Sequence, residues 1–244
     1  MFFQKGLFMA LEVIKNEAEL SNDIREIFSK AGAVEIVQRR AHEYAEMMAY
    51  YRCALMEVET KFNVLNEEFS LQYDRNPIEM VKTRLKSPAS IRTKLERYGF
   101  DMSLDSIRKN IHDIAGVRVI CSFINDVYIL ADALLKQDDI TLISKKDYIK
   151  NPKPNGYRSY HMIVEIPVFF AKGKTPMRVE LQIRTNGMDF WATLEHQLRY
   201  KKGIEEMPGY DEISEELLHS ARAIIEADNE MQRIKDKIGM FHEI

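Results

Sequence analysis

Apolar side chains recur at alternating steps of three and four residues along two long segments of the chain, residues 34–69 and residues 217–241. The apolar positions of the first segment are Val34, Val37, Ala41, Tyr44, Met48, Tyr51, Leu55, Val58, Phe62, Leu65 and Phe69. A repeat of about 3.5 residues is typical of a helix with a narrow apolar seam. We therefore predict a long helix here that packs lengthwise against another helix.

The second repeat contains an acidic position. Its seam consists of Leu217, Ala221, Ile224, Asp228, Met231, Ile234, Ile238 and Phe241. The two helices can pack within one chain or between two subunits, and the sequence leaves both arrangements open. Because a carboxylate in an apolar seam is costly unless it is paired, Asp228 favours assembly with a second subunit.

Between these helices the hydrophobic period changes repeatedly between that of strands and that of helices. Strands are predicted at residues 116–123, 140–144, 157–167 and 177–184. Helices are predicted at residues 87–97, 104–111, 126–136 and 185–200. Strands interleaved with helices predict an α/β (α+β) fold, a mixed β-sheet flanked by helices. We place this core at residues 80–201, between an N-terminal helical extension (1–79) and a C-terminal helix (202–244) that serves oligomerisation.

Composition narrows the function classes. Hydrophobic residues make up 45% and charged residues 30% of the chain, as in soluble globular proteins. The formal net charge of −3 argues against a general nucleic-acid binder, so DNA is not an expected partner. The two cysteines, Cys53 and Cys121, indicate the reduced thiols of a cytoplasmic protein. We expect no membrane partner, since no apolar run has spanning length and no signal-peptide pattern is found.

The segment at residues 147–161, DYIKNPKPNGYRSYH, combines a basic turn with a strand that begins at a tyrosine. Its positive charges are Lys150, Lys153 and Arg158. The Asn155-Gly156 pair suits a turn with positive φ, and strand alternation places Tyr157 and His161 on one face. An aromatic ring beside lysines suits a purine nucleotide, because the ring can stack on the base while the lysines hold the phosphates.

One face of the predicted strand at residues 177–184 is polar throughout. Its polar residues are Arg178, Glu180, Gln182 and Arg184, which alternate with Val179, Leu181 and Ile183. Such a face is usually the solvated side of an edge strand. The alternative is a functional surface, which Trp191 and the Glu195-His196 pair on the following helix would extend.

Asp113 stands at the entrance to the predicted strand 116–123, with Arg118 five positions later. Asp113 is either an ordinary polar residue at the start of a strand or a metal-binding carboxylate beside an arginine that faces a nucleotide. The spacing does not itself bring Asp113 near Glu180, 67 residues away. If the fold does, the two carboxylates would hold Mg²⁺ on a triphosphate, since oxygen ligands suit that ion.

Several nucleotide and metal patterns are absent from the sequence. It contains neither a GxxxxGK[ST] loop nor a GxGxxG fingerprint, which disfavours P-loop and Rossmann sites. A metal-dependent phosphohydrolase would need more well-placed histidines than the six present, and zinc is not expected.

Four segments, taken in order, resemble the (p)ppGpp synthetase domain of the RelA/SpoT family, and most closely its small alarmone synthetases of the RelQ kind. They are RLKSPASIRTKLER (84–97), DIAGVRVIC (113–121), DYIKNPKPNGYRSYH (147–161) and VELQIRTNGMDFWATLEHQLRYK (179–201). The resemblance covers residues 80–201 and implies a nucleotidyltransferase-like core. It further implies a GTP diphosphokinase that transfers pyrophosphate from ATP to the 3′-hydroxyl of GTP or GDP, which makes (p)ppGpp, the alarmone of the stringent response.

The resemblance also implies the residues of the ATP site. Arg84 and Arg118 would sandwich the adenine, as guanidinium planes stack on purines. Lys86, Ser90 and Lys94 would hold the phosphates of ATP.

On the acceptor side, the resemblance implies that Tyr157 stacks on guanine, with Lys153 and Asn155 close to the nucleotide. His161 and Lys146 would lie near its phosphates.

At the centre of the implied site, Asp113 and Glu180 would bind Mg²⁺. Glu180 would also help to deprotonate the 3′-hydroxyl, with Gln182 beside it.

Regulation and assembly follow from the resemblance as well. Residues 1–80 lack the histidine-rich pattern of the family's hydrolase domain, which implies a synthetase without hydrolase activity. Small members of the family are commonly tetramers, and (p)ppGpp is a possible allosteric ligand. Ser144 stands where longer relatives carry an arginine, which leaves the preference between GTP and GDP open.

Two other functions remain open at this point. The first is a nucleotide-binding regulator that has the same pocket but has lost the chemistry. The second is a synthetase that uses ATP as donor and an adenylate or a tRNA end as acceptor.

Overall fold

The computed structural model describes residues 32–73, 75–202 and 209–242. Its centre is a five-stranded sheet with the strand order β1-β2-β5-β4-β3. The strands are β1 (Ile78–Leu85), β2 (Ala115–Cys121), β3 (Thr141–Asp147), β4 (Tyr160–Phe170) and β5 (Gly173–Thr185). Strands β2 and β5 are parallel and the other neighbours are antiparallel, so the predicted mixed sheet is confirmed.

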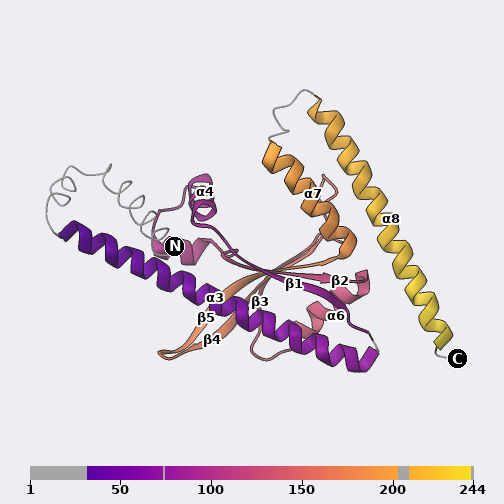
Figure 1. Ribbon diagram of the computed structural model, residues 1–244, viewed down its shortest axis with the longest axis horizontal. Helices are drawn as coiled ribbons and strands as arrows, with labels where there is room; N and C mark the ends of the chain where they lie inside the picture. The colour runs from indigo at the N-terminus through magenta and orange to yellow at the C-terminus, as the bar shows by residue number, and fades with distance from the viewer. Residues whose placement is uncertain (1–31, 74, 203–208, 243–244) are drawn as a thin grey trace.

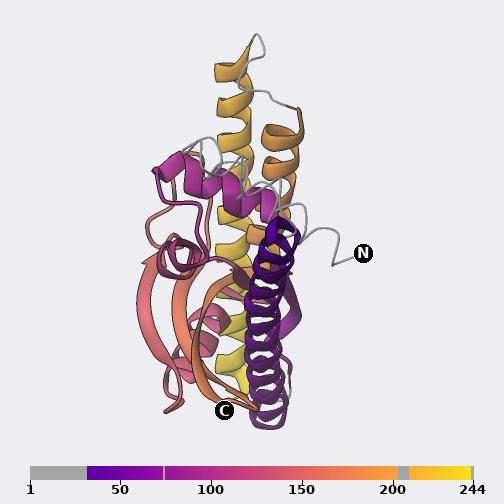
Figure 2. The same cartoon turned by 90° about the vertical axis from the view of Figure 1, so that its left-hand side faces the viewer.

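Six helices surround this sheet in the described part of the chain (Figure 1). They are α3 (Gly32–Tyr73), α4 (Pro88–Tyr98), α5 (Leu104–Asn110), α6 (Ile124–Leu135), α7 (Asn186–Lys202) and α8 (Tyr210–His242). Helix α3 packs along the sheet and α6, whereas α8 packs against α7 and α6. Figure 2 shows α3 and α8 as the two long elements of the molecule. None of the described helices is long and apolar enough to cross a membrane.

The seam of α3 is buried inside this chain. Tyr51, Leu55 and Phe62 belong to one core cluster with Leu181 and Ile183 of β5. The predicted lengthwise packing against another helix is therefore wrong, since α3 lies mainly on a sheet. The buried stripe also includes Met47 and Ala54, outside the narrow seam. This wider stripe is typical of a helix that covers a broad apolar surface. The side chains of Val34 and Val37 lie outside the described residues.

Asp228, the acidic position in the seam of α8, is paired within the chain. Its Oδ2 accepts a hydrogen bond from Thr185 Oγ1 at 2.8 Å and lies 3.5 Å from Arg158 Nη1. This carboxylate therefore does not need a partner from a second subunit. The last turns of the seam remain uncovered, with Met231 and Ile238 each 53% exposed. The side chain of Phe241 lies outside the described residues.

Two local differences from the predicted strands matter for the site. The edge strand β1 was not predicted, because its sequence IEMVKTRL lacks a strict alternation of apolar and polar residues. Strand β4 begins at Tyr160 rather than at residue 157, so Tyr157 lies in the loop before it. By contrast, the predicted cap of α7 is confirmed, since Thr185 Oγ1 accepts a hydrogen bond from Met188 N at 3.1 Å.

Candidate active site

Strand pairing places one polar residue from each strand at the same level of the sheet. The row is Lys82, Arg118, Gln182, His161 and Lys146, in the spatial order of the strands. Residues paired across neighbouring strands point to the same face. The side chains of this row therefore share one face, opposite the apolar core. The polar side of β5 is thus a shared polar surface in the interior of a sheet and not a solvated edge.

The next level of the sheet leaves room for a carboxylate. Arg84, Gly116 and Glu180 are successive partners in it. Gly116 has no side chain, and a Cβ there would lie 4.0 Å from Glu180 Oε2. Asp113 lies just before β2, at the same end of the parallel β2–β5 pair as Glu180. The fold therefore places these two carboxylates, which are 67 residues apart in sequence, near the same end of the β2–β5 pair.

Asp113 is held by two lysines. Its Oδ2 accepts a hydrogen bond from Lys86 Nζ at 2.9 Å, and its Oδ1 lies 2.9 Å from Lys94 Nζ. Burial by itself raises the pKa of Asp113, but the hydrogen bonds and charges of Lys94 and Lys86 outweigh it and lower the pKa. The carboxylate is therefore ionised at neutral pH. Lys94 reaches it from α4, which begins at the cap formed by Ser87 and carries Ser90 in its first turn.

A chain of hydrogen bonds joins Tyr157 to Glu180. His161 Nε2 lies 2.8 Å from the Tyr157 hydroxyl, and Arg184 donates to that hydroxyl. Arg184 Nη2 also donates to Gln182 Oε1 at 2.8 Å, and Gln182 Nε2 donates to Glu180 Oε2 at 3.0 Å. The loop tyrosine and the carboxylate of β5 are thus linked by two intervening side chains, those of Arg184 and Gln182.

In the loop between β3 and β4, Lys153 lies against two aromatic rings. Lys153 Nζ lies 4.8 Å from the ring centroid of Tyr157 and 4.9 Å from that of Tyr148. Asn155 is engaged inside the protein: its Oδ1 accepts from Tyr157 N at 3.2 Å, and its Nδ2 donates to Glu195 Oε1 at 3.0 Å. Asn155 therefore shapes the loop that carries Tyr157.

His161 is neutral in this environment. Burial lowers its pKa to about 3, and the charges of Arg184, Lys153, Lys146 and Arg118 act in the same direction. A neutral imidazole can accept a hydrogen bond from the Tyr157 hydroxyl, which fits the contact between them.

The lowered pKa of His161 predicts that the free energy of unfolding falls in mild acid. The folded-state pKa of His161 lies below its unfolded value of about 6.5, so only the unfolded chain takes up the proton as the pH falls below that value. We expect about 2 kcal/mol less unfolding free energy at pH 5 than at pH 7 from this residue. Urea unfolding at both pH values measures it.

The variant His161→Gln is the control for this pH dependence, and it should lose less stability between pH 7 and 5 than the parent. The pKa of His112 is lowered too, first by burial, and contributes equally in both proteins. An identical pH dependence of the two proteins would contradict the neutral state of His161.

The carboxylates near this face offer oxygen ligands of the kind that Mg²⁺ prefers. Among the described residues, no group of three or more His, Cys, Asp or Glu side chains is arranged to hold a metal ion. Mg²⁺ commonly takes one or two protein carboxylates and completes its shell with phosphate and water oxygens. Glu180 fits that role, because no cation among the described residues lies within ion-pair distance of its carboxylate. Asp113 is the second available carboxylate.

Three residues that matter for this arrangement carry little signal in the sequence. Arg184 and Glu195 were predicted only as parts of a polar surface, and Asp189 was not predicted. Asp189 is 8% exposed and contacts Arg118 and Arg184. The available signal was its helical spacing from Thr185 and Ala192, both buried, which puts a carboxylate on a buried helix face.

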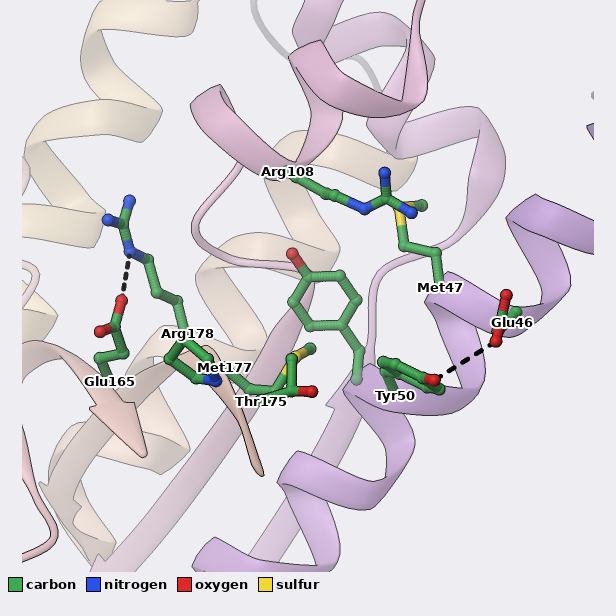
Figure 3. A pocket seen from close by; sticks show the side chains of 10 residues that line it. Glu46, Met47, Tyr50, Arg108, Glu165, Thr175, Met177 and Arg178 are labelled. Carbon is green, nitrogen blue, oxygen red and sulfur yellow. Dashed lines mark hydrogen bonds and ion pairs between the residues drawn. The ribbon is translucent and has the colours of Figure 1, made fainter. Parts of the chain in front are cut away.

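A separate cavity of about 380 Å³ opens between α3, α5 and the β4–β5 hairpin (Figure 3). Its walls are formed by Glu46, Met47, Tyr50, Tyr51, Arg108, Glu165, Thr175, Pro176, Met177 and Arg178. Several of its charges are paired, since Arg178 Nε contacts Glu165 at 3.3 Å and Lys172 contacts Glu46 at 3.2 Å. None of the substrate-binding or metal-binding residues implied by the family resemblance lines this cavity, although Arg178 and Glu165 at one end of the polar face form part of its wall.

Comparison with known sequences identifies relatives over most of the chain. A model of the region found in RelA/SpoT proteins matches residues 83–205. The GTP pyrophosphokinase YwaC of Bacillus subtilis is 40% identical over 196 residues, which cover 80% of this chain and 92% of that protein. The GTP pyrophosphokinase YjbM of the same organism is 34% identical, over 80% of this chain and 90% of that protein.

Solved structures agree with these matches. Small alarmone synthetase 1 from Bacillus subtilis, bound to its product pppGpp, superposes with a TM-score of 0.72 at 34% identity, over 80% of this chain and 98% of that one. Small alarmone synthetase 2 from the same organism gives a TM-score of 0.72 at 40% identity, over 80% and 99%. The family match, the identity over most of the length and the shared fold together show that this chain belongs to the RelA/SpoT family.

Proposed function

We propose that the protein is a Mg²⁺-dependent GTP/GDP pyrophosphokinase that makes (p)ppGpp. The observation that carries the proposal is the position of Glu180 on the polar face. A chain of hydrogen bonds joins it to Tyr157, and the lysine-bound Asp113 lies near the same end of the β2–β5 pair. The proposal is supported by relatives named GTP pyrophosphokinases and by related structures that contain pppGpp or AMPCPP.

The donor nucleotide is assigned to the side of β1, β2 and α4. Arg84 and Arg118 belong to neighbouring strands at successive levels, so their guanidinium groups can flank an adenine ring. Lys86 directly follows β1, and Ser90 and Lys94 lie on the first and second turns of α4, so their charges and hydroxyl can bind the phosphates. Phosphate oxygens would then replace Asp113 as partners of the two lysines.

The acceptor nucleotide is assigned to the side of β3, β4 and the loop between them. Tyr157 offers its ring to guanine, and Lys153 lies against the same ring. Lys146 is paired with His161 across β3 and β4, so a cation and a neutral hydrogen-bonding group would face the acceptor phosphates together. Gln182 joins this side to Glu180.

In the proposed reaction the 3′-oxygen of GTP or GDP attacks the β-phosphorus of ATP. The bond between that phosphorus and the oxygen shared with the α-phosphate breaks, and AMP leaves. Glu180 accepts the proton of the 3′-hydroxyl, a suitable role for a positioned carboxylate. Mg²⁺ held by Asp113 and Glu180 would offset charge on the transferring group, and Lys86 and Lys94 would add to that effect.

A transfer assay tests the proposal. Purified protein is incubated with Mg²⁺ and γ-labelled ATP, and GTP, GDP, GMP or AMP is offered in turn as acceptor. Labelled guanosine penta- or tetraphosphate is the expected product. Nucleotide binding without transfer would instead favour a regulator, and transfer to adenine nucleotides alone would overturn the assignment of the acceptor. The same assay ranks GTP against GDP.

Substitution of Tyr157 by Ala should raise the KM for the acceptor and leave the KM for ATP nearly unchanged. Stacking of a base on an aromatic ring is worth about 1–3 kcal/mol, so we expect an increase of about 5- to 150-fold. Steady-state kinetics with each substrate varied in turn measures both constants. In Tyr157→Phe the ring remains and the hydroxyl is lost, so its acceptor KM should lie much closer to that of the parent. Equal rises for both substrates in Tyr157→Ala would contradict the stacking role.

The proposal includes a cytoplasmic homotetramer, with (p)ppGpp as a possible allosteric ligand. Assembly through the C-terminal helix is supported by apolar side chains of α7 and α8 that this chain leaves uncovered. They include Phe190, Leu194, Leu198, Met231, Ile234 and Ile238. Light scattering that detects only monomer at assay concentrations would exclude the tetramer, and an unchanged rate on addition of pppGpp would exclude activation.

A further inference from the structure

Asp189 is a buried carboxylate on the first turns of α7 that has no role in the chemistry above. Its Oδ1 accepts hydrogen bonds from Arg118 Nη1 at 3.0 Å and from Arg184 Nη1 at 3.2 Å. Its Oδ2 lies 3.4 Å from Lys82 Nζ. One carboxylate therefore binds three cations that come from three adjacent strands.

The two arginines are held together against their mutual repulsion. Burial lowers the pKa of Arg118, the charge of Arg184 lowers it further, and the charge of Asp189 raises it. Arg184 is 3% exposed, so solvent does little to screen its charge. Without the negative charge of Asp189, the guanidinium groups would be expected to move apart, because like charges in a poorly solvated site repel strongly.

The two arginines serve different nucleotides in the proposed reaction. Arg118 lies beside Arg84 on the donor side, across the β1–β2 pair. Arg184 lies 5.0 Å from the ring centroid of Tyr157 and bonds its hydroxyl and Gln182 on the acceptor side. Asp189 is the shared partner of both.

We infer that Asp189 is a positioning residue. It holds Arg118 and Arg184 in a fixed relative position and so aligns the donor site with the acceptor site. The inference rests on the proposed function, since it assigns the two arginines to two substrates. It also accounts for the place of α7, which packs against both β2 and β5. The relative position of the two sites matters because transfer between two bound nucleotides depends on the alignment of the reacting atoms.

Anchoring of α7 does not depend on Asp189. Thr185 caps the helix through Met188 N, and Trp191 Nε1 donates to Leu217 O of α8 at 3.1 Å. Met188, Trp191 and Ala192 are buried. A change of Asp189 to Asn, which keeps the volume of the side chain and removes its charge, should therefore leave the helix in place.

The test compares the KM values of Asp189→Asn with those of variants that disturb one site only. We expect Asp189→Asn to raise the KM for ATP and the KM for GDP by about tenfold or more each, since each loses a charge-assisted anchor. Arg84→Ala should raise mainly the KM for ATP, and Tyr157→Ala mainly that for GDP. A change in only one constant, or in neither, for Asp189→Asn would overturn the inference.

A matched control distinguishes a positioning role of Asp189 from a purely structural one. Asp126 is a fully buried carboxylate that also binds cations, Arg75 at 2.5 Å and Lys235 at 3.1 Å, but none that faces a nucleotide. Asp126→Asn should lower the melting temperature and leave both KM values of the folded protein unchanged. If Asp189→Asn behaved in the same way, the inference would fail. If Asp189→Asn did not fold, Asp189→Glu would replace it under the same two-sided criterion, because it shifts the charge by one methylene.

The transfer assay on the parent protein distinguishes failure of the proposed function from failure of the inference about Asp189. Absence of transfer by the parent would refute the proposed function alone. Equilibrium titrations with AMPCPP and with GDP on the same variants would still decide the inference. A rise in both dissociation constants for Asp189→Asn would support it, and a rise in one or none would refute it.

Discussion

Substitution of Glu180 by Gln should reduce kcat by about a thousandfold or more and leave nucleotide affinity within a few-fold. A general base contributes about 10²–10⁴ to a rate, and loss of a carboxylate ligand for Mg²⁺ adds to this effect. Gln has nearly the same shape, and its Oε1 can still accept the hydrogen bond from Gln182 Nε2, which spans 3.0 Å in the parent. Single-turnover transfer and titration with AMPCPP and GDP measure the two quantities.

Glu165→Gln is the matched control for Glu180→Gln. Glu165 is paired with Arg178 across β4 and β5 and so points to the same face as Glu180, one level further along β5. Its carboxylate is already in an ion pair with Arg178. We expect its loss to change kcat little. A similar fall in kcat for both variants would mean that the face as a whole, and not Glu180, supports the chemistry.

The fold was predictable from the sequence as far as hydrophobic periods determine it. The strict alternation around Val179, Leu181 and Ile183 gave β5, and the long repeat gave α3. The partner of α3 was not predictable, because a 3.5-residue repeat records that one side is apolar and does not say what covers it. Asp228 shows the same limit. Its partners, Thr185 and Arg158, are 43 and 70 positions away in the sequence and meet it only in the folded chain.

The candidate site was predictable where a residue type alone suggests chemistry. Tyr157 beside lysines and Glu180 on a polar strand face carry such a signal. The contacts that organise these residues were not predictable, because they depend on strand register. Arg118 lies level with Gln182 only because β2 and β5 are parallel neighbours with this alignment. Asp189 was missed for the same reason, since its role depends on two arginines from two different strands.

Gly156 is the second position at which a single change should have a large effect. Its φ is 88°, which side chains other than glycine rarely adopt, and a Cβ there would lie 2.4 Å from the Cβ of Ala221. Strain of the backbone and overpacking against α8 each cost about 1–3 kcal/mol. We therefore expect Gly156→Ala to lower the free energy of unfolding by about 2–6 kcal/mol, measured by urea unfolding.

The same substitution should impair the acceptor site. Gly156 directly precedes Tyr157, so a shift of the loop away from α8 moves the ring that is proposed to stack on guanine. We expect a clear rise in the KM for GDP, whereas the KM for ATP should change little because Arg84 and Lys94 lie on other elements. Kinetics on the folded fraction, at a temperature well below the unfolding midpoint, separate this effect from the loss of stability.

Two further variants isolate the contact with α8. Gly173 has a φ of 119° and nothing within 4 Å of an added Cβ, so Gly173→Ala should show the backbone strain without the clash. Adding Ala221→Gly to Gly156→Ala removes the colliding methyl group, although a glycine inside a helix itself costs about 1 kcal/mol. We expect the double variant to recover the KM for GDP in large part. If it did not, the close packing of α8 on this loop would have no part in holding Tyr157 in place.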